Sequence, residues 1–361
     1  MVSSGDDATR HIRLNCTELT PVGASASSRR AAIRRVNCRL CQPRSVATVL
    51  RAAAISSRRI RAFGRFALFI SCIYNKCVYM DNPFRQMVEM DLGEIERHWT
   101  MRTTQRTPVL LLHGSSGAGR SWKRVVERLE GVAPVAAPDL PGHGSSIPLE
   151  APASERTRVA AVAMLSHLEA MTPPLTLVGH SYGGNVALHL AALAPERLAG
   201  LVLLEPVCFR ALTLAGASAE FQAAERFFAA YVSVVESGAP DAIAAMVDYW
   251  FGKGVFDAMP PPARQHLNRA AAANARDVAA SFADRIEAEA LRRIACPVRL
   301  VAGAASPPVA GRILDALEQL LPDACRETIA GATHAMLDSH PVEVADLIAR
   351  ASGQAPVSAM A

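Results

Sequence analysis

The sequence predicts an α/β protein whose mostly parallel sheet is covered by helices on both faces. From about Glu94 onward, short apolar runs alternate with longer amphipathic stretches. Short buried strands that alternate with helices are typical of a parallel sheet with crossover helices. The chain has 361 residues, 50% of them hydrophobic, which is enough material for a large core. No apolar run approaches the ~20 residues that a membrane-spanning helix needs, so no membrane span is expected.

The individual elements follow from the spacing of apolar residues and from the residues that end helices. Ser121 is expected to cap a helix whose apolar residues recur at helical spacing and which ends at Gly131. Pro195 is expected to end the helix that begins at Tyr182. The expected strands are 94–100, 108–112, 132–139, 175–179, 200–204, 298–303 and 326–330. The other expected helices are 154–170, 312–321 and one that starts at Pro341.

The stretch from 206 to 292 interrupts this alternation. Its composition is helical throughout, and it contains no run of the sheet type. A helical insertion between two strands of an α/β sheet would lie over the carboxyl ends of the strands, where such sheets bind ligands. The expected domains are therefore a core formed by 81–205 and 293–352, a helical cap formed by 206–292, and a tail from 353 to 361.

The first 80 residues differ in composition from the rest. They contain 14 Lys and Arg against 3 Asp and Glu, whereas the remainder has 24 against 30. An Arg- and Ser-rich, acid-poor segment is typical of a transit peptide. The arginines are scattered among small residues, which does not favour a nucleic-acid-binding arm. We expect a basic extension that is disordered, or upstream sequence that precedes a true start at Met80, Met87 or Met90.

The cysteines give an expectation about metals and about location. Cys38 and Cys41 form a C-x-x-C pair, but no second pair with zinc-like spacing follows. No metal and no organic cofactor are therefore expected. The dispersed Cys208, Cys296 and Cys325 are typical of reduced thiols, so a cytoplasmic location is expected, with the transit-like N-terminus as the alternative. The oligomeric state is left open.

The strongest chemical signal is "VGHSYGG", from Val178 to Gly184. It contains G-x-S-x-G directly after an expected strand and directly before an expected helix. In that context the tight turn exposes the hydroxyl of Ser181, and the small residues let neighbouring backbone pass close by. The helix N-terminus below the turn offers free N–H groups to a developing negative charge. Ser181 is therefore the candidate nucleophile.

A second signal is "LLLHGSSGAG", from Leu110 to Gly119. An apolar strand ends in His-Gly and is followed by a loop of small residues. A backbone N–H of this loop can face the same oxyanion as the N–H after the nucleophile. The candidate donors are the N–H groups of Ser115 and Tyr182. His113 is expected to be a hydrogen-bonded structural histidine beside the substrate pocket rather than a base.

Together these motifs make the chain resemble the α/β-hydrolase superfamily over about residues 94–352. The matching blocks, in the order of that family, are "HGSSG" (113–117), "PDLPGHGSS" (138–146), "GHSYGG" (179–184) and "GATHAMLDSHP" (331–341). The resemblance implies that His334 is the catalytic base and that Asp139 and His143 are architectural. Thr333 stands where the family often has glycine.

The resemblance also implies a carboxylate that orients the base. In the commonest form of the family the acid follows the strand "VRLVAG", and that position is occupied by Ser306. Glu205 directly follows the strand after the nucleophile, where some members carry their acid. We therefore expect the triad Ser181, Glu205 and His334, with a helix-capping role for Glu205 as the alternative. Asp338 is the next candidate acid.

The expected function is that of a serine hydrolase acting on a small or medium apolar ester, lactone or thioester. A serine nucleophile does not favour the branches that open epoxides or haloalkanes with aspartate. A carbon–carbon bond hydrolase on the same triad is one alternative, and a non-catalytic ligand-binding protein is another. The cap is rich in aromatic residues, and Tyr249 and Trp250 are expected, with His113, to line the pocket. The expected partner is a small-molecule substrate and no nucleic acid.

Overall fold

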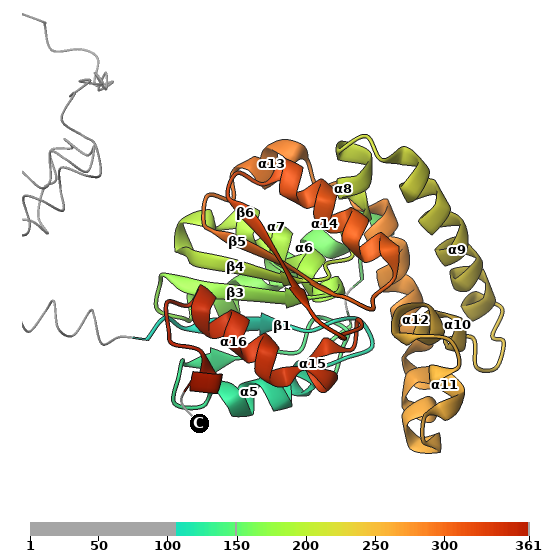
Figure 1. Ribbon diagram of the computed structural model, residues 1–361. Coiled ribbons are helices and arrows are strands. Elements are labelled where there is room, and N and C mark those ends of the chain that lie inside the picture. Colours follow the sequence, from blue (N-terminus) through green and yellow to red (C-terminus); the bar gives the residue numbers. More distant parts are fainter. Residues whose placement is uncertain (1–105, 149, 360–361) are drawn as a thin grey trace, which may run out of the picture. The chain divides into compact units, whose positions relative to one another are not determined.

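The computed structural model describes residues 106–148 and 150–359. Six parallel strands form its sheet, in the order β2-β1-β3-β4-β5-β6 (Figure 1). The strands are β1 (Val109–Leu112), β2 (Val135–Ala136), β3 (Leu175–His180), β4 (Leu198–Leu204), β5 (Val298–Gly303) and β6 (Ala324–Ile329). The prediction of a mostly parallel α/β fold is confirmed. The strand expected at 94–100 and the extension expected at 1–80 lie outside the described residues.

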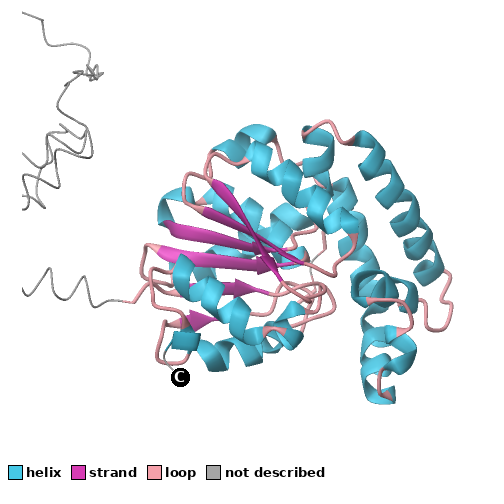
Figure 2. Ribbon diagram, in the orientation of Figure 1, coloured by secondary structure: helices cyan, strands magenta, loops and turns pink. Residues whose placement is uncertain are grey.

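Helices cover both faces of the sheet (Figure 2). Successive strand residues point to opposite faces, so Leu110 and Leu112 join one apolar cluster and Val109 and Leu111 the other. The first cluster includes helices α6 (Ala153–Glu169), α7 (Tyr182–Leu193) and α14 (Pro308–Leu320). The second includes α5 (Lys123–Leu129), α15 (Met336–Ser339) and α16 (Pro341–Ala351). The central strands β1, β3 and β4 are buried on both sides, which explains why their sequences are almost entirely apolar.

Several element boundaries differ from those that the sequence predicted, and prolines explain two of them. β2 has only two residues, because Pro134 and Pro138 lie close to its ends and lack the N–H that a ladder needs. α14 begins at Pro308, a residue that suits the first turn of a helix. Ser121 lies in the 3₁₀ turn η2 (Gly119–Trp122), and its hydroxyl accepts from the N–H of Ala118 rather than capping α5.

Between β4 and β5 the chain forms helices and no strand. They are α8 (Phe209–Leu214), α9 (Ser218–Glu236), α10 (Ala244–Phe251), α11 (Val255–Ala258), α12 (Pro261–Ala283) and α13 (Ala288–Arg292). We call residues 206–292 the cap segment. Its long helix α12 packs against α6 of the sheet layer and against α9, so it joins the two sets of helices. Figure 1 shows α9 to α12 grouped beside one end of the sheet.

The remaining short elements lie at the ends of longer ones. A 3₁₀ turn, η3 (Pro195–Arg197), connects α7 to β4. A second, η4 (Val357–Ala359), follows α16, where the Ser358 N–H and hydroxyl both donate to Asp346. No helix in the described part of the chain has the length and apolar character needed to cross a bilayer.

Candidate active site

Ser181 occupies the sharp turn between β3 and α7. Its backbone has φ 55° and ψ −121°, a conformation that is strained for a residue with a side chain. The turn is held because the Ser181 N–H donates to Leu204 and the Ser181 carbonyl accepts from Val207. A side chain at Gly183 would collide with the carbonyl oxygens that end β1, so glycine is required there. The strand-turn-helix geometry that the motif predicted is present.

The loop after β1 approaches this turn closely. A Cβ atom added at Gly114 would lie 3.1 Å from Cβ of Ser181 and 3.2 Å from Nδ1 of His180. Among the described residues, the N–H of Ser115 donates to no acceptor. Tyr182 is the first residue of α7, where a backbone N–H has no partner within the helix. Both candidate oxyanion donors are thus free to bind a ligand.

His334 and Glu205 form a buried pair. Nδ1 of His334 lies 2.6 Å from Oε2 of Glu205, and Glu205 is 1% exposed. The other carboxylate oxygen, Oε1, accepts from the N–H of Gly303 at 2.7 Å. Both carboxylate oxygens are therefore held, and they fix the orientation of the imidazole ring. Glu205 also has a positive φ of 44°, so two of the three predicted triad residues have strained backbones.

Surrounding groups keep Glu205 ionised despite its burial. Burial by itself raises the pKa of the Glu205 carboxyl. The hydrogen bond and charge of His334 oppose this effect, together with the Ser306 hydroxyl and the Gly303 N–H, and the pKa falls below its ordinary value. A carboxylate that remains charged can stabilise an imidazolium beside it.

The sheet register explains how Glu205 reaches His334 although the usual position of the acid, after β5, is occupied by Ser306. β4 and β5 are neighbours, and Leu204 pairs with Val301. Glu205 therefore emerges beside the end of β5, where Gly303 binds its carboxylate. Asp338, the second candidate acid, lies exposed on α15; its N–H donates to Ala335 and its carbonyl accepts from Arg124, but within the described residues its carboxylate has no hydrogen-bond partner. The structure joins Glu205 and not Asp338 to His334.

The imidazole of His334 is enclosed by other rings and is 4% exposed. Trp250 of α10 stacks on it with ring centroids 4.3 Å apart, and His180 lies at 4.8 Å. His180 donates from Nε2 to the carbonyl oxygen of His334. Burial, followed by the charge of His334, lowers the pKa of His180 to about 3, so His180 is neutral at ordinary pH.

A cavity of about 330 Å³ opens between the turn at Ser181 and the cap segment. Ser181, His334, Ser115 and Tyr182 all border it, so the structure brings the predicted catalytic residues to one space. Most of the remaining wall is apolar and comes from the cap segment. These residues include Phe209, Phe228, Ile243, Met246, Val247, Trp250, Phe251 and Val255.

Two of the three predicted pocket residues do not line this cavity. His113 is fully buried; its Nδ1 donates to the carbonyl of Gly114 and its Nε2 accepts from the N–H of Leu140. Tyr249 packs on Phe227 at 4.5 Å between ring centroids. The pocket role predicted for these two is wrong, because a buried hydrogen-bonded ring and a ring directed at another helix do not face the cavity. Trp250 does line it.

Replacing His113 should change how stability depends on pH. Burial lowers the pKa of His113 from 6.5 to about 4, so between these values the unfolded chain binds a proton that the folded one does not. Stability therefore falls as pH falls through this window, by about 1.4 kcal/mol per pH unit for one proton. We expect His113→Gln, whose amide oxygen can accept from Leu140, to reduce the slope by about that amount. Urea unfolding at several pH values would show it, and an unchanged slope would contradict it.

Within the described residues, no group of three or more His, Cys, Asp or Glu is placed to hold a metal ion. The site described above is built from a serine, a histidine and a carboxylate, with backbone N–H donors and an apolar wall. Such an arrangement can support nucleophilic attack on a carbonyl carbon.

The chain belongs to the alpha/beta hydrolase family, whose model matches residues 109–347. This confirms the resemblance drawn from the four sequence blocks. A relative that aligns along most of its length is a pimeloyl-[acyl-carrier protein] methyl ester esterase of Chromobacterium violaceum. It is 32% identical over 255 residues, which are 65% of this chain and 90% of the relative.

Other relatives align over shorter stretches. Lipase LipV of Mycobacterium tuberculosis is 47% identical over 98 residues, which are 27% of this chain and 36% of that protein. The chain covers about a third of the first curated relatives that it matches. Among solved structures, a thermophilic esterase of Thermogutta terrifontis is similar with a TM-score of 0.51 and 26% identity, over 68% of this chain and 89% of that one.

Proposed function

We propose that this protein is a serine hydrolase that cleaves an ester-type bond through an acyl-enzyme on Ser181. The observation that carries the proposal is the 2.6 Å pair of His334 and Glu205 at the same cavity as Ser181. The strained turn at Ser181 is a second support, because strain persists where the surrounding structure maintains it. The names of the relatives, which include a lipase and methyl ester esterases, agree with this chemistry.

In the proposed mechanism, Oγ of Ser181 attacks the carbonyl carbon of the substrate while Nε2 of His334 accepts the hydroxyl proton. Glu205 stabilises the imidazolium through Nδ1. The N–H groups of Ser115 and Tyr182 bind the oxygen that becomes negative. The tetrahedral intermediate then expels the alcohol, which takes the proton from His334. Water, activated by the same histidine, attacks the acyl-enzyme and releases the acid with free Ser181.

The cavity supports an apolar substrate of small or medium size. Its volume of about 330 Å³ is at the lower end of the range for ligand sites, and its cap wall is formed mainly by aliphatic and aromatic side chains. An ester, lactone or thioester with an apolar acyl group fits this wall. A carbon–carbon bond hydrolase on the same triad would show cleavage of a diketone in place of an ester.

Covalent labelling tests the nucleophile directly. A fluorophosphonate probe should modify Ser181, located by mass spectrometry of the tryptic peptide, and the Ser181→Ala protein should not be modified. A panel of ester, lactone, thioester and diketone substrates then separates the reaction classes. Absence of a Ser181 adduct, with the protein folded by circular dichroism, would refute the hydrolase and favour a ligand-binding protein.

A further inference from the structure

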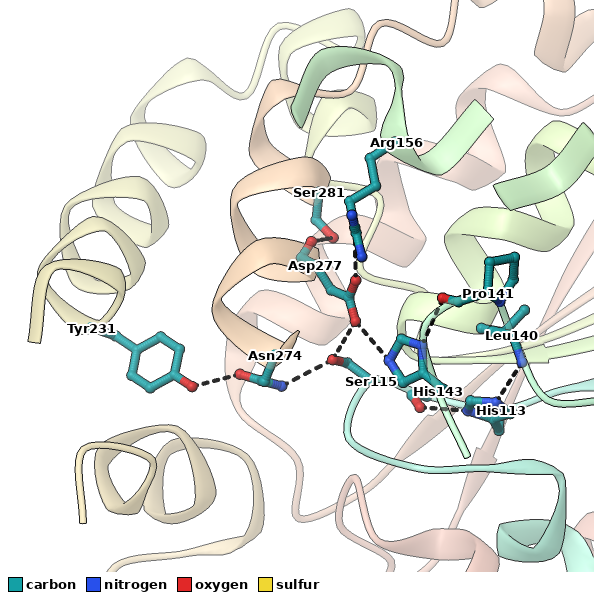
Figure 3. Close-up of polar contacts among 11 residues, drawn as sticks. His113, Ser115, Leu140, Pro141, His143, Arg156, Tyr231, Asn274, Asp277 and Ser281 are labelled. Carbon is teal, nitrogen blue, oxygen red and sulfur yellow. Dashed lines mark hydrogen bonds and ion pairs between the residues drawn. The ribbon is translucent and has the colours of Figure 1, made fainter. Parts of the chain in front are cut away.

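A buried carboxylate of the cap segment contacts the loop that carries the candidate oxyanion donor. Asp277 of α12 is 1% exposed, and the Ser115 hydroxyl donates to its Oδ2 at 2.7 Å. Nε2 of His143 lies 2.9 Å from the same oxygen, and Nε of Arg156 donates to Oδ1 at 3.3 Å. Figure 3 shows these groups converging on Asp277 from separate segments. The triad chemistry uses none of Asp277, His143 and Arg156.

Charge compensation explains how Asp277 is tolerated in the interior. An uncompensated buried carboxylate is strongly unfavourable, and Arg156 of α6 supplies the opposite charge at a site that is also buried. Burial on its own would lower the pKa of His143, but the neighbouring Asp277 raises it above the ordinary value. The chain thus keeps an ion pair in its interior, although an apolar contact at the same place would avoid the cost of removing two charges from water.

Asn274, one turn earlier on α12, holds the same hydroxyl from its other side. Its Nδ2 donates to Oγ of Ser115 at 3.1 Å, and its Oδ1 accepts from the Tyr231 hydroxyl of α9 at 2.7 Å. The Ser115 hydroxyl therefore donates to one residue of α12 and accepts from another, which fixes its direction. Figure 3 shows this chain of hydrogen bonds running from Tyr231 at the left to Ser115 near the centre.

The loop that receives these bonds is short and bent. It closes with a hydrogen bond from the Gly117 N–H to the Gly114 carbonyl, and Ser116 has a positive φ of 63°. Because the Ser115 hydroxyl and N–H belong to one residue, anchoring the side chain restricts the movement of the backbone that carries the N–H. A misdirected donor stabilises an oxyanion poorly, since such stabilisation depends on donors that are in place before the reaction.

We propose that Asp277 is a positioning residue for the oxyanion hole and acts through the Ser115 hydroxyl. The proposal rests on the proposed hydrolase function, in which the Ser115 N–H binds the oxyanion. It implies that the oxyanion hole is complete only while α12 of the cap segment is docked on the core. The cap segment then contributes to the chemical step as well as to the shape of the cavity.

A second buried pair on the same helix end provides a matched control. Asp284 directly follows α12, is 5% exposed, and lies 2.9 Å from Nε2 of His189 on α7. Like Asp277, it joins the end of α12 to the core through a histidine. Its hydrogen-bond partners, His189 and Ile286, are not part of the loop at 114–117. Asp284→Asn therefore removes the charge of a comparable buried carboxylate on α12 while leaving every hydrogen bond of Ser115 in place.

The experiment compares Asp277→Asn, Ser115→Ala, their double variant and Asp284→Asn in the full chain. Ser115→Ala keeps the backbone N–H and deletes one oxygen, so it remains informative if Asp277→Asn fails to fold. The readouts are kcat and KM on an ester turned over by the wild type, and hydrogen exchange of the peptide that spans 113–119.

We expect Asp277→Asn and Ser115→Ala each to lower kcat by about 10- to 100-fold with KM changed less than about 3-fold, and to speed exchange in the loop. The double variant should lose no more than the larger single loss, and Asp284→Asn should change neither readout. Equal effects of Asp277→Asn and Asp284→Asn, additive losses, or unchanged loop exchange would overturn the proposal. If the wild type hydrolyses nothing but the loop exchange responds as expected, ester hydrolysis is refuted while positioning of the loop is supported.

Discussion

Ser181→Ala is expected to lower kcat for ester hydrolysis by about 10⁵- to 10⁶-fold, the largest effect of any single substitution in this chain. Without Oγ no acyl-enzyme forms, and the remaining rate comes from the backbone donors and from substrate binding. KM should change little, because the apolar wall and the donors of Ser115 and Tyr182 are intact. Steady-state kinetics on the best ester of the panel would measure the loss, and a loss under about 100-fold would refute the nucleophile assignment.

A matched substitution at the same position separates chemistry from strain. Ser181→Gly also removes the hydroxyl, but glycine adopts φ 55° without the steric cost that alanine or serine bears. The glycine variant should be as inactive as the alanine variant and about 1 kcal/mol more stable than it toward urea. Equal stability of the two variants would show that the turn carries no strain.

Glu205→Gln is expected to lower kcat by about 10³- to 10⁴-fold while the protein stays folded. The amide lacks the charge that stabilises the imidazolium, and its NH₂ group can present a donor to Nδ1 of His334, which favours the wrong tautomer. Comparison with Asp338→Asn decides between the two candidate acids by kinetics under identical conditions. A larger loss of kcat for Asp338→Asn than for Glu205→Gln would show that Asp338 is the acid that orients His334.

Position 306, where the commonest form of the family carries its acid, allows a rescue experiment. Ser306 lies beside the Glu205 carboxylate, after the turn that follows β5. In a Glu205→Ala background, Ser306→Asp should restore kcat by about 10-fold or more, since it returns a carboxylate to the same histidine from the neighbouring strand. Ser306→Asn in that background is the control, and equal rates for the two would exclude rescue by charge.

The sequence predicted the part of the site that depends on strand ends. Ser181 and Glu205 each follow a buried strand directly, and carboxyl ends of neighbouring parallel strands meet at one edge, so their proximity could be anticipated. The position of Ser306 indicated that the acid had to come from elsewhere. His334 was located by the resemblance, because a loop histidine has no periodic pattern that identifies it.

The sequence could not show which aromatic residues of the cap segment line the cavity, and helix geometry gives the reason. Tyr249 and Trp250 are adjacent on α10 and therefore differ by about 100° in direction around the helix. Trp250 faces His334, whereas Tyr249 faces Phe227 and Phe228. Helical spacing distinguishes a buried face from an exposed one, but it does not distinguish a cavity wall from a packed core.

Asp277 lies beyond sequence reasoning because its partners are distant along the chain. It is separated from Ser115 by 162 positions and from Arg156 by 121. Its immediate neighbours on α12 are Arg276 and Val278 in an alanine-rich stretch, and this pattern does not distinguish it from an ordinary charge on a solvated helix. The signal that could have identified it is a pattern of substitutions shared with Arg156 across related chains.

The two buried carboxylates at the end of α12 also determine which part of the cap segment can move. Asp277 and Asp284 attach the C-terminal end of this helix to the core, whereas its first residues, from Pro261 to Ala270, are largely exposed. Opening of the cavity should therefore pivot about this attached end. The segment that swings is expected to be α10 and α11 with the start of α12, which together carry much of the apolar wall of the cavity.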